Sequence, residues 1–187
     1  MTRMKENYES RSKTYLTRRT PVIIRLDGKA FHTYTRGLNK PFDEGIIEDM
    51  EATTKFLCEN TQGVKLGYCQ SDEISLLVTD YDDFNTQAWF DYNVQKITSI
   101  SASMATAKFN QLRLSRRSYN SQSLPTPDVI DNINLAFFDA RVFNIPKEEV
   151  ANYFLARQKD AVKNSISMLA QSLYSHKELH KKNGNEM

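Results

Sequence analysis

Three carboxylates stand at the ends of apolar stretches. Asp27 ends one such stretch, and the adjacent Asp72 and Glu73 lie between two others. Carboxylates that converge on one point repel one another unless they share protons or bind cations. Oxygen ligands without nearby histidine or cysteine favour Mg²⁺ over zinc. Two Mg²⁺ ions held by aspartates can activate a hydroxyl and stabilise a leaving oxygen, which is the chemistry of phosphoryl transfer.

The residues after Asp27 would serve the same chemistry. Gly28 allows the backbone to approach a phosphate, and the amides of the segment 28–32 ("GKAFH") can cradle it. Asp-Gly alone is most often a turn, and Ser-Asp-Glu alone is most often a surface loop. Only their combination at the ends of apolar strands favours phosphoryl transfer.

The elements that must position these residues follow from the apolar pattern. We expect strands at 21–27, 64–68 and 74–80, helices at 43–60 (capped by Asp43), 86–110 and 146–174, a loop at 112–131, and a strand pair or one bent strand at 132–145. This order predicts an α+β fold of the ferredoxin-like kind, a split βαβ with helices on one face of an antiparallel sheet, plus an extra C-terminal helix from about residue 146. The first and third strands are then neighbours, so Asp27 should approach Asp72 and Glu73.

The helix at 86–110 has a predicted inner side. Its members are Trp89, Asn93, Ile97, Ile100, Met104 and Ala107. The preceding helix should bury Ile46, Ile47, Met50, Thr54 and Leu57.

Composition bounds the class of protein. The chain has 187 residues, 40% hydrophobic and 26% charged, which suits one domain over 1–187 without an internal linker. It has no apolar run near the roughly 20 residues of a membrane span and no signal-peptide pattern at its start, so we expect a cytoplasmic protein with no membrane contact. Cys58 and Cys69 are expected to be buried free thiols.

The net charge of +2 says little about nucleic acid, but its distribution says more. Arg18 and Arg19 belong to one basic cluster, and Arg116 and Arg117 to another. Both clusters lie among aromatic residues and can follow a phosphate backbone. A solvated basic surface is an equally good interpretation.

Five segments in order carry a family resemblance. They are "RLDGKAFH" (25–32), "NKPFDE" (39–44), "GYCQSDEISLL" (67–77), "FDARV" (138–142) and "RQKDAVKNS" (157–165). Together they resemble the histidine-tRNA guanylyltransferase family, whose members extend RNA in the 3′-to-5′ direction. The resemblance implies a palm-like catalytic domain, similar to that of ordinary polymerases, and a homotetramer.

The resemblance also implies the roles of individual residues. Metal ligands would be Asp27, the Gly28 carbonyl and Asp72, holding two Mg²⁺ ions, with Asp27, Asp72 and Glu73 catalytic. The role of Glu73 stays open between ligand and support. Nucleotide contacts would come from Asp27, Gly28, Lys29, Ala30, Phe31, His32, Lys40, Ser71, Asp72 and Lys96. A structural histidine is the alternative for His32, and a solvated lysine is the alternative for Lys40 and for Lys96.

One departure bears on the reaction. Members that add guanosine to histidine tRNA carry His-Ile-Asn-Asn where this chain has Val162, Lys163, Asn164 and Ser165. The chain therefore resembles the bacterial, archaeal and phage branch, which suits template-dependent repair of tRNA with an incomplete 5′ end, using ATP or GTP as activating and incoming substrates. Arg157 and Asn164 would face the RNA, unless an Arg157–Asp160 pair merely steadies the helix.

Three alternatives stay open at this point. The first is guanosine addition before the first nucleotide of histidine tRNA. A palm-type nucleotide cyclase would use the same carboxylates without RNA. A non-catalytic tRNA-binding module would need neither "DGKAFH" nor "QSDE".

Overall fold

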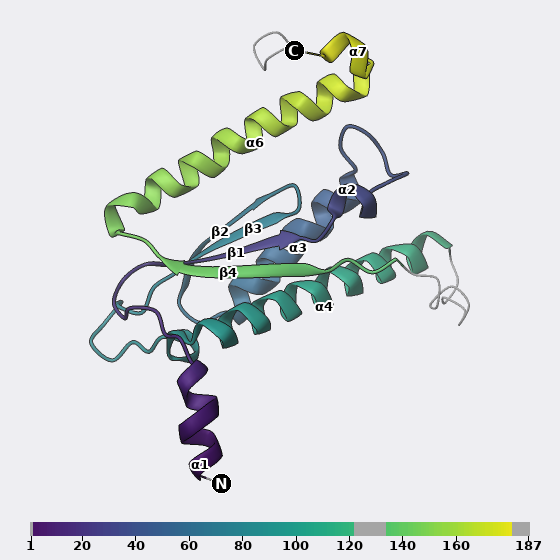
Figure 1. The fold of residues 1–187 in the computed structure, drawn as a ribbon. Coiled ribbons are helices and arrows are strands. Elements are labelled where there is room, and N and C mark those ends of the chain that lie inside the picture. Colours follow the sequence, from purple (N-terminus) through teal and green to yellow (C-terminus); the bar gives the residue numbers. More distant parts are fainter. Residues whose placement is uncertain (1, 122–133, 181–187) are drawn as a thin grey trace.

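The computed structural model describes residues 2–121 and 134–180, and among these every side chain except those of 117–121 and His176. Its centre is a sheet of β1 (Val22–Gly28), β2 (Val64–Gln70), β3 (Glu73–Val78) and β4 (Phe138–Asn144). The strand order is β2-β3-β1-β4, and each neighbouring pair is antiparallel (Figure 1). Among the described residues this is a mixed α and β fold, as the sequence predicts.

Helices α3 (Glu44–Asn60) and α4 (Val94–Ser121) cover one face of the sheet. Every second residue of β1 points into the core between them, because side chains alternate along a strand. Leu26 of β1, Leu57 of α3 and Phe109 of α4 are fully buried there. Asp43 caps α3 as predicted, since its Oδ1 accepts a hydrogen bond from the Ile46 amide at 3.0 Å.

Helix α6 (Val150–Leu173) lies on the other side of the sheet from α4 (Figure 1). A 3₁₀ turn, η4 (Lys147–Glu149), leads into it, and the short α7 (His176–Leu179) follows it. Its first half contacts the sheet through large side chains, with the Phe154 ring 6.1 Å from that of Tyr68. Its second half runs away from the strands. α6 is the extra C-terminal helix of the prediction, and its position on the other face of the sheet is one that the apolar pattern does not define.

The chain begins with α1 (Thr2–Met4), a π-helical turn η1 (Lys5–Glu9) and a 3₁₀ turn η2 (Ser10–Ser12). Two further short elements are α2 (Phe31–Tyr34) after β1 and η3 (Trp89–Tyr92) before α4. Three consecutive residues of η3 have positive φ angles between 50° and 56°. This left-handed turn lies within η3, and α4 starts only at Val94, so the predicted start of the long helix at residue 86 is wrong.

The other end of α4 also differs from the prediction. The helix continues to Ser121, although residues 112–121 were expected in a loop. Arg113 and Arg116 extend it because they reach Asp49 on α3, at 3.0 and 2.9 Å. The buried line is also shifted: Ile100 and Ala107 are exposed, whereas Ser101, Ala105 and Phe109 are buried. On α3, Ile47 likewise lies outside the core, at 44% exposure.

Candidate active site

The edge where β1 ends brings Asp27 and Asp72 together. Asp27 pairs in register with Glu73 at the start of β3, directly after the Ser71–Asp72 turn. The Gly28 amide donates a hydrogen bond to the Asp72 carbonyl oxygen at 3.1 Å. The turn between β2 and β3 is therefore bonded to the end of β1, as the predicted topology requires.

Asp72 has an unfavourable environment for a charge. Burial raises the pKa of its carboxyl, and the nearby Asp27 carboxylate raises it further. The Ser71 hydroxyl lowers that pKa, because its Oγ donates a hydrogen bond to Asp72 Oδ1 at 3.0 Å, and so does the charge of His32. A buried Asp72 carboxyl beside a second carboxylate forms a site that a bound cation would stabilise.

The Glu73 carboxylate is already paired with two arginines. Its Oε2 receives the Arg25 guanidinium at 2.5 Å and Arg157 Nη1 at 3.3 Å. Its side chain is 8% exposed, and its Oε1 is buried without a hydrogen-bond partner among the described residues. Glu73 thus joins β1, β3 and α6, a role that the sequence left open.

The segment after Asp27 forms a compact turn. Gly28 admits no side chain, because a Cβ there would lie 2.3 Å from the Phe31 ring. The Lys29 amide donates to the Phe137 carbonyl oxygen at 2.8 Å, and Ala30 takes a left-handed φ of 52°. Phe31 is 6% exposed and packs in the core. Among the predicted nucleotide contacts, the side chain of Phe31 therefore has a structural role.

The donors at this edge fit a hard cation. Asp27, Asp72 and the Gly28 carbonyl offer oxygen alone, which is the donor set that Mg²⁺ prefers. Among the described residues, no group of three or more histidine, cysteine, aspartate or glutamate side chains is arranged to hold a metal. Two carboxylates and a carbonyl leave most positions of a magnesium ion to water and substrate, as magnesium sites usually do.

Lys96 is not brought to this edge. Because β3 is antiparallel to β1, the chain leaves β3 at the end opposite Asp27, and α4 begins there. The Lys96 ammonium lies over the Phe90 ring, 5.6 Å from its centroid. Within one chain Lys96 therefore lies away from Asp27, and its assignment as a nucleotide contact stays a prediction. Lys40 is exposed in the loop before α3, and no described contact joins it to Asp27 or Asp72.

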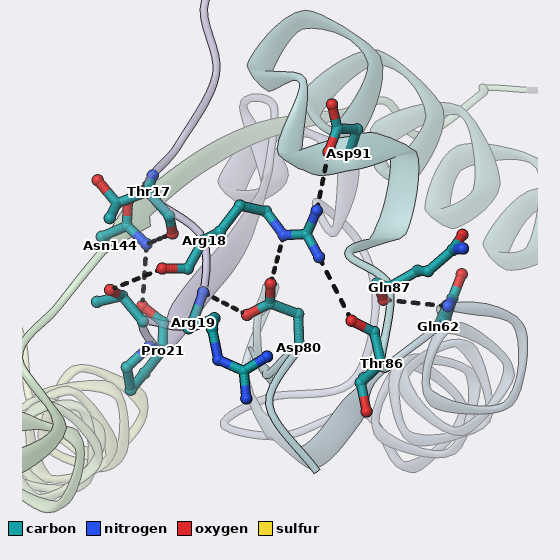
Figure 2. A network of polar contacts seen from close by, with 11 residues as sticks. Thr17, Arg18, Arg19, Pro21, Gln62, Asp80, Thr86, Gln87, Asp91 and Asn144 are labelled. Carbon is teal, nitrogen blue, oxygen red and sulfur yellow. Dashed lines mark hydrogen bonds and ion pairs between the residues drawn. The ribbon is translucent and has the colours of Figure 1, made fainter. Parts of the chain in front are cut away.

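The first basic cluster is part of the fold at that far end (Figure 2). Arg18 Nε lies 2.5 Å from Asp80, its Nη1 lies 3.1 Å from Asp91, and its Nη2 donates to the Thr86 carbonyl oxygen. The Arg19 amide donates to the other Asp80 oxygen at 2.7 Å. Arg18 therefore has its charge matched by acids, and its assignment as an RNA contact stays a prediction.

The second basic cluster is also paired with acids. Arg116 reaches Glu48 at 2.8 Å and the buried Asp49 at 2.9 Å, while the side chain of Arg117 lies outside the described set. A hollow of about 340 Å³ beside them is lined by Asn39, Asp43, Glu44, Gly45, Glu48, Arg113 and Arg116. The structure gives Arg116 a role in joining α3 to α4.

Arg157 faces the sheet and bonds two acids. Besides Glu73, it reaches Asp160 at 2.7 Å, so the helix-steadying alternative is confirmed as a contact. Its neighbour Gln158 accepts a hydrogen bond from the Tyr68 hydroxyl at 3.0 Å. Asn164 is exposed further along α6 and has no described contact with the site.

Three residues on the same face as Asp27 were not predicted from the sequence. They are Arg25 of β1 and the two β4 residues Asp139 and Arg141. Asp139 of β4 is in register with Asp27, and Arg141 is in register with Arg25. The "FDARV" segment and the alternation of a strand were the available signals, but they identify a face only once the strand neighbours are known.

The sequence and the fold are both similar to those of known proteins. A family model described as tRNAHis guanylyltransferase matches residues 1–146. A bacterial tRNA(His) guanylyltransferase (Thg1)-like protein solved with ATP has a TM-score of 0.88 and 50% identity, over 99% of this chain and 75% of that one. The corresponding complex with GTP has a TM-score of 0.82 and 50% identity, over 94% and 77% of the two chains.

Curated relatives agree with the structures. The tRNA(His) guanylyltransferase of Kluyveromyces lactis is 30% identical over 142 residues, which cover 73% of this chain and 54% of that protein. The chain spans about half the length of the curated relatives it matches.

The fold is that of the Thg1-like proteins solved with ATP and with GTP. The chain belongs to the tRNAHis guanylyltransferase family. No helix in the described ranges has the length and apolar character needed to cross a membrane.

Proposed function

We propose that this protein adds nucleotides to the 5′ end of tRNA, in the 3′-to-5′ direction and under the direction of a template strand. The observation that carries the proposal is the convergence of Asp27 and Asp72 at one edge, beside the turn of residues 28–32. Relatives at 50% identity are solved with ATP and GTP, which supports nucleoside triphosphates as substrates. The domain would then be a palm, for which the strand order β2-β3-β1-β4 is suitable.

Each residue of the edge would have a separate task. Asp27, Asp72 and the Gly28 carbonyl would hold Mg²⁺, which when bound supplies charge stabilisation at the phosphate and favours ionisation of the attacking hydroxyl. Ser71 orients the Asp72 carboxylate through its hydroxyl. The amides that follow Asp27 would bind phosphate oxygens, and the exposed His32 would donate to them.

Glu73 would act as a positioning residue. It is held by Arg25 and Arg157, so it fixes the first residue of β3 directly after Asp72. In this arrangement the new bond forms between the 3′-oxygen of the incoming nucleotide and the 5′-phosphorus of the RNA, and pyrophosphate or AMP leaves. The leaving group depends on whether the RNA carries a triphosphate or an adenylyl cap.

The preference for repair over guanosine addition rests on α6. Val162, Lys163 and Ser165 replace three of the four residues of His-Ile-Asn-Asn, and Val162 is 50% exposed. Guanosine addition to histidine tRNA stays the second candidate because the family model carries that description. A homotetramer and a cytoplasmic location stay predictions.

The test is nucleotide addition to tRNAs that lack one 5′ nucleotide, with each of the four triphosphates in turn. We expect addition of the base that pairs with the opposite strand, dependence on Mg²⁺, and loss after chelation. Addition of guanosine whatever the opposite base would favour the second candidate. Cyclic products from GTP alone would indicate a cyclase, and tRNA binding without addition or Mg²⁺ uptake would indicate a binding module.

A further inference from the structure

An exposed aromatic residue lies directly beside the turn that follows Asp27. Within that turn, the Lys29 amide donates a hydrogen bond to the Phe137 carbonyl oxygen at 2.8 Å. Phe138 is buried in the core, and side chains alternate along an extended chain. Phe137 therefore projects from the other face of the sheet, which is the face that carries Asp27. Phe137 is 52% exposed, and no aromatic ring in the described ranges packs against it.

The backbone around Phe137 is held on both sides, although it precedes β4. Asn110 of α4 bonds Ala136 twice, since its Nδ2 donates to the carbonyl oxygen at 2.8 Å and its Oδ1 accepts from the amide at 3.0 Å. The Phe138 amide donates to Thr106 Oγ1 on the same helix at 3.2 Å. Because an aromatic side chain turns about only two χ angles, a fixed backbone presents its ring as a nearly rigid platform.

A second exposed phenylalanine lacks this setting. Phe84 is 91% exposed in the loop after β3, at the end of the sheet opposite Asp27, because β3 is antiparallel to β1. Single exposed apolar residues are ordinary, so exposure alone does not define a site. Phe137 differs from Phe84 because it is bonded to the turn of residues 28–32 and shares a face with Asp27.

We propose that the Phe137 ring is a stacking platform for a nucleobase of the substrate. Asp139 lies opposite Asp27, and Phe137 lies two residues from Asp139 on the same face, which is roughly 7 Å along the chain. This separation suits a nucleotide with its phosphate at the Asp27 edge and its base one ribose away.

A base is the fitting ligand because each of the four bases has a π-face that stacks on an aromatic ring, without recognition of its edge. Template-directed addition requires such tolerance, since the opposite strand rather than the protein selects the base. The inference rests on the proposed function, because it names how a base of that reaction is held.

Two sources could supply this base, the incoming nucleotide or the 5′-terminal nucleotide of the RNA. Phe137→Leu removes the ring and keeps an apolar side chain at the same exposed position. Binding to the full chain is measured by isothermal titration calorimetry at fixed salt and Mg²⁺. One arm compares each of the four nucleoside triphosphates with ribose triphosphate, which lacks a base. The other compares an RNA hairpin with the same hairpin made abasic at its 5′ nucleotide. Neither arm contains both substrates, so no addition occurs.

In the wild-type chain we expect the base to raise affinity in at least one arm, and Phe137→Leu to lower that gain about tenfold. The arm that responds identifies the source of the base. If the triphosphate arm responds, all four nucleotides should lose affinity, because stacking does not select among bases. Phe84→Leu is the matched control, the same change at a more exposed phenylalanine, and should alter neither arm.

Phe137→Trp gives a second readout that loss of folding cannot imitate. This variant keeps a ring, so it should retain the gain in affinity from the base, and a stacked base should quench the emission of the new tryptophan. Ribose triphosphate and the abasic hairpin should not quench it, and Phe84→Trp should respond to no ligand. A wild-type gain that Phe137→Leu leaves unchanged in both arms would overturn the inference, as would a wild-type chain without any gain.

Nucleotide addition by the wild-type chain is scored separately. Base-dependent binding through Phe137 without any addition would remove the proposed function and leave the stacking site. Addition by a wild-type chain whose base-dependent affinity is unchanged in Phe137→Leu would keep the proposed function and remove the inference.

Discussion

The two faces of one sheet differ in what they bury. Toward α3 and α4, Ile24, Leu26 and Leu76 are fully buried among apolar side chains. Toward α6, the same strands present Asp27 and Glu73 among arginines. Because side chains alternate along a strand, each residue on one face has neighbours one position away on the other. The apolar face supplies stability, and the charged face is left for chemistry.

The helices on the two faces are attached differently. α3 and α4 pack through apolar side chains, whose burial is the dominant favourable term in folding. α6 attaches through a few ring contacts and through polar pairs, with the Tyr153 hydroxyl 2.9 Å from Ser75 Oγ and Arg157 3.3 Å from Glu73. Buried ion pairs add little net stability but fix geometry, because breaking one leaves an unpaired charge. We infer that α6 holds the hairpin tip in place more than it stabilises the fold.

The largest stability effect should come from the apolar face. Leu76→Ala removes a fully buried side chain between β3 and the helices, so unfolding should become easier by about 2–5 kcal/mol. The comparison is Ser75→Ala, which changes the neighbouring residue on the other face of β3. Denaturant titration of the two variants in parallel measures the loss of unfolding free energy in each. Equal losses for both would mean that the two faces contribute alike.

A smaller loss should follow Glu73→Gln, which keeps the shape and removes the charge. Arg25 and Arg157 would lose their shared carboxylate, at a cost of about 2 kcal/mol. A double-mutant cycle with Arg157→Met should show a coupling of about 1 kcal/mol between helix and sheet. Additive effects of the two changes would show that this contact does not tie α6 to the hairpin.

Ser75→Ala tests the neutral part of the same attachment. The change removes the partner of the Tyr153 hydroxyl and should cost about 1 kcal/mol. Tyr153→Phe removes the other half of the bond and is its matched control. If Ser75→Ala in a Tyr153→Phe background still cost the same, the hydrogen bond would not be the source of the effect.

The smallest change should be in the stabilising direction. The pKa of Asp72 is raised in the folded chain, so its charge costs stability above that pKa, and this cost disappears below the ordinary value near 3.8. Asp72→Asn should therefore stabilise the metal-free chain at pH 7, by less than about 1 kcal/mol, and the difference should vanish toward pH 3.5. Thermal unfolding across this range measures it, and a variant less stable than wild type at pH 7 would contradict the assigned cause.

Strand ends were predictable and charge partners were not. Asp27 and Asp72 follow from apolar runs and a topology that makes β1 and β3 neighbours. One of the two partners of Glu73 is Arg157, 84 residues away on a helix whose position over the sheet no local pattern encodes. The sequence therefore predicted that Glu73 lies at the site, but not that it joins α6 to the sheet.

Errors on α4 have a similar origin. The helical period was clear, but the left-handed turn of three residues before Asn93 moved the start of the helix. Trp89, Asn93 and Ile97 are buried as predicted, whereas further along the helix Ser101, Ala105 and Phe109 are buried in place of Ile100 and Ala107. The position of Lys96 within one chain could have been predicted. Strand direction alone puts the start of α4 at the end of the sheet away from Asp27, and a basic residue there cannot serve that edge within one chain.

The central claim is that the charged face performs nucleotide transfer at Asp27. The direct measurement is the single-turnover rate of 5′ addition to a labelled tRNA lacking one nucleotide, for Asp27→Asn and wild type. We predict a rate loss of about 10³-fold or more with RNA affinity within about threefold of wild type, since the carboxylate acts in the chemical step. A near wild-type rate for Asp27→Asn would contradict the account.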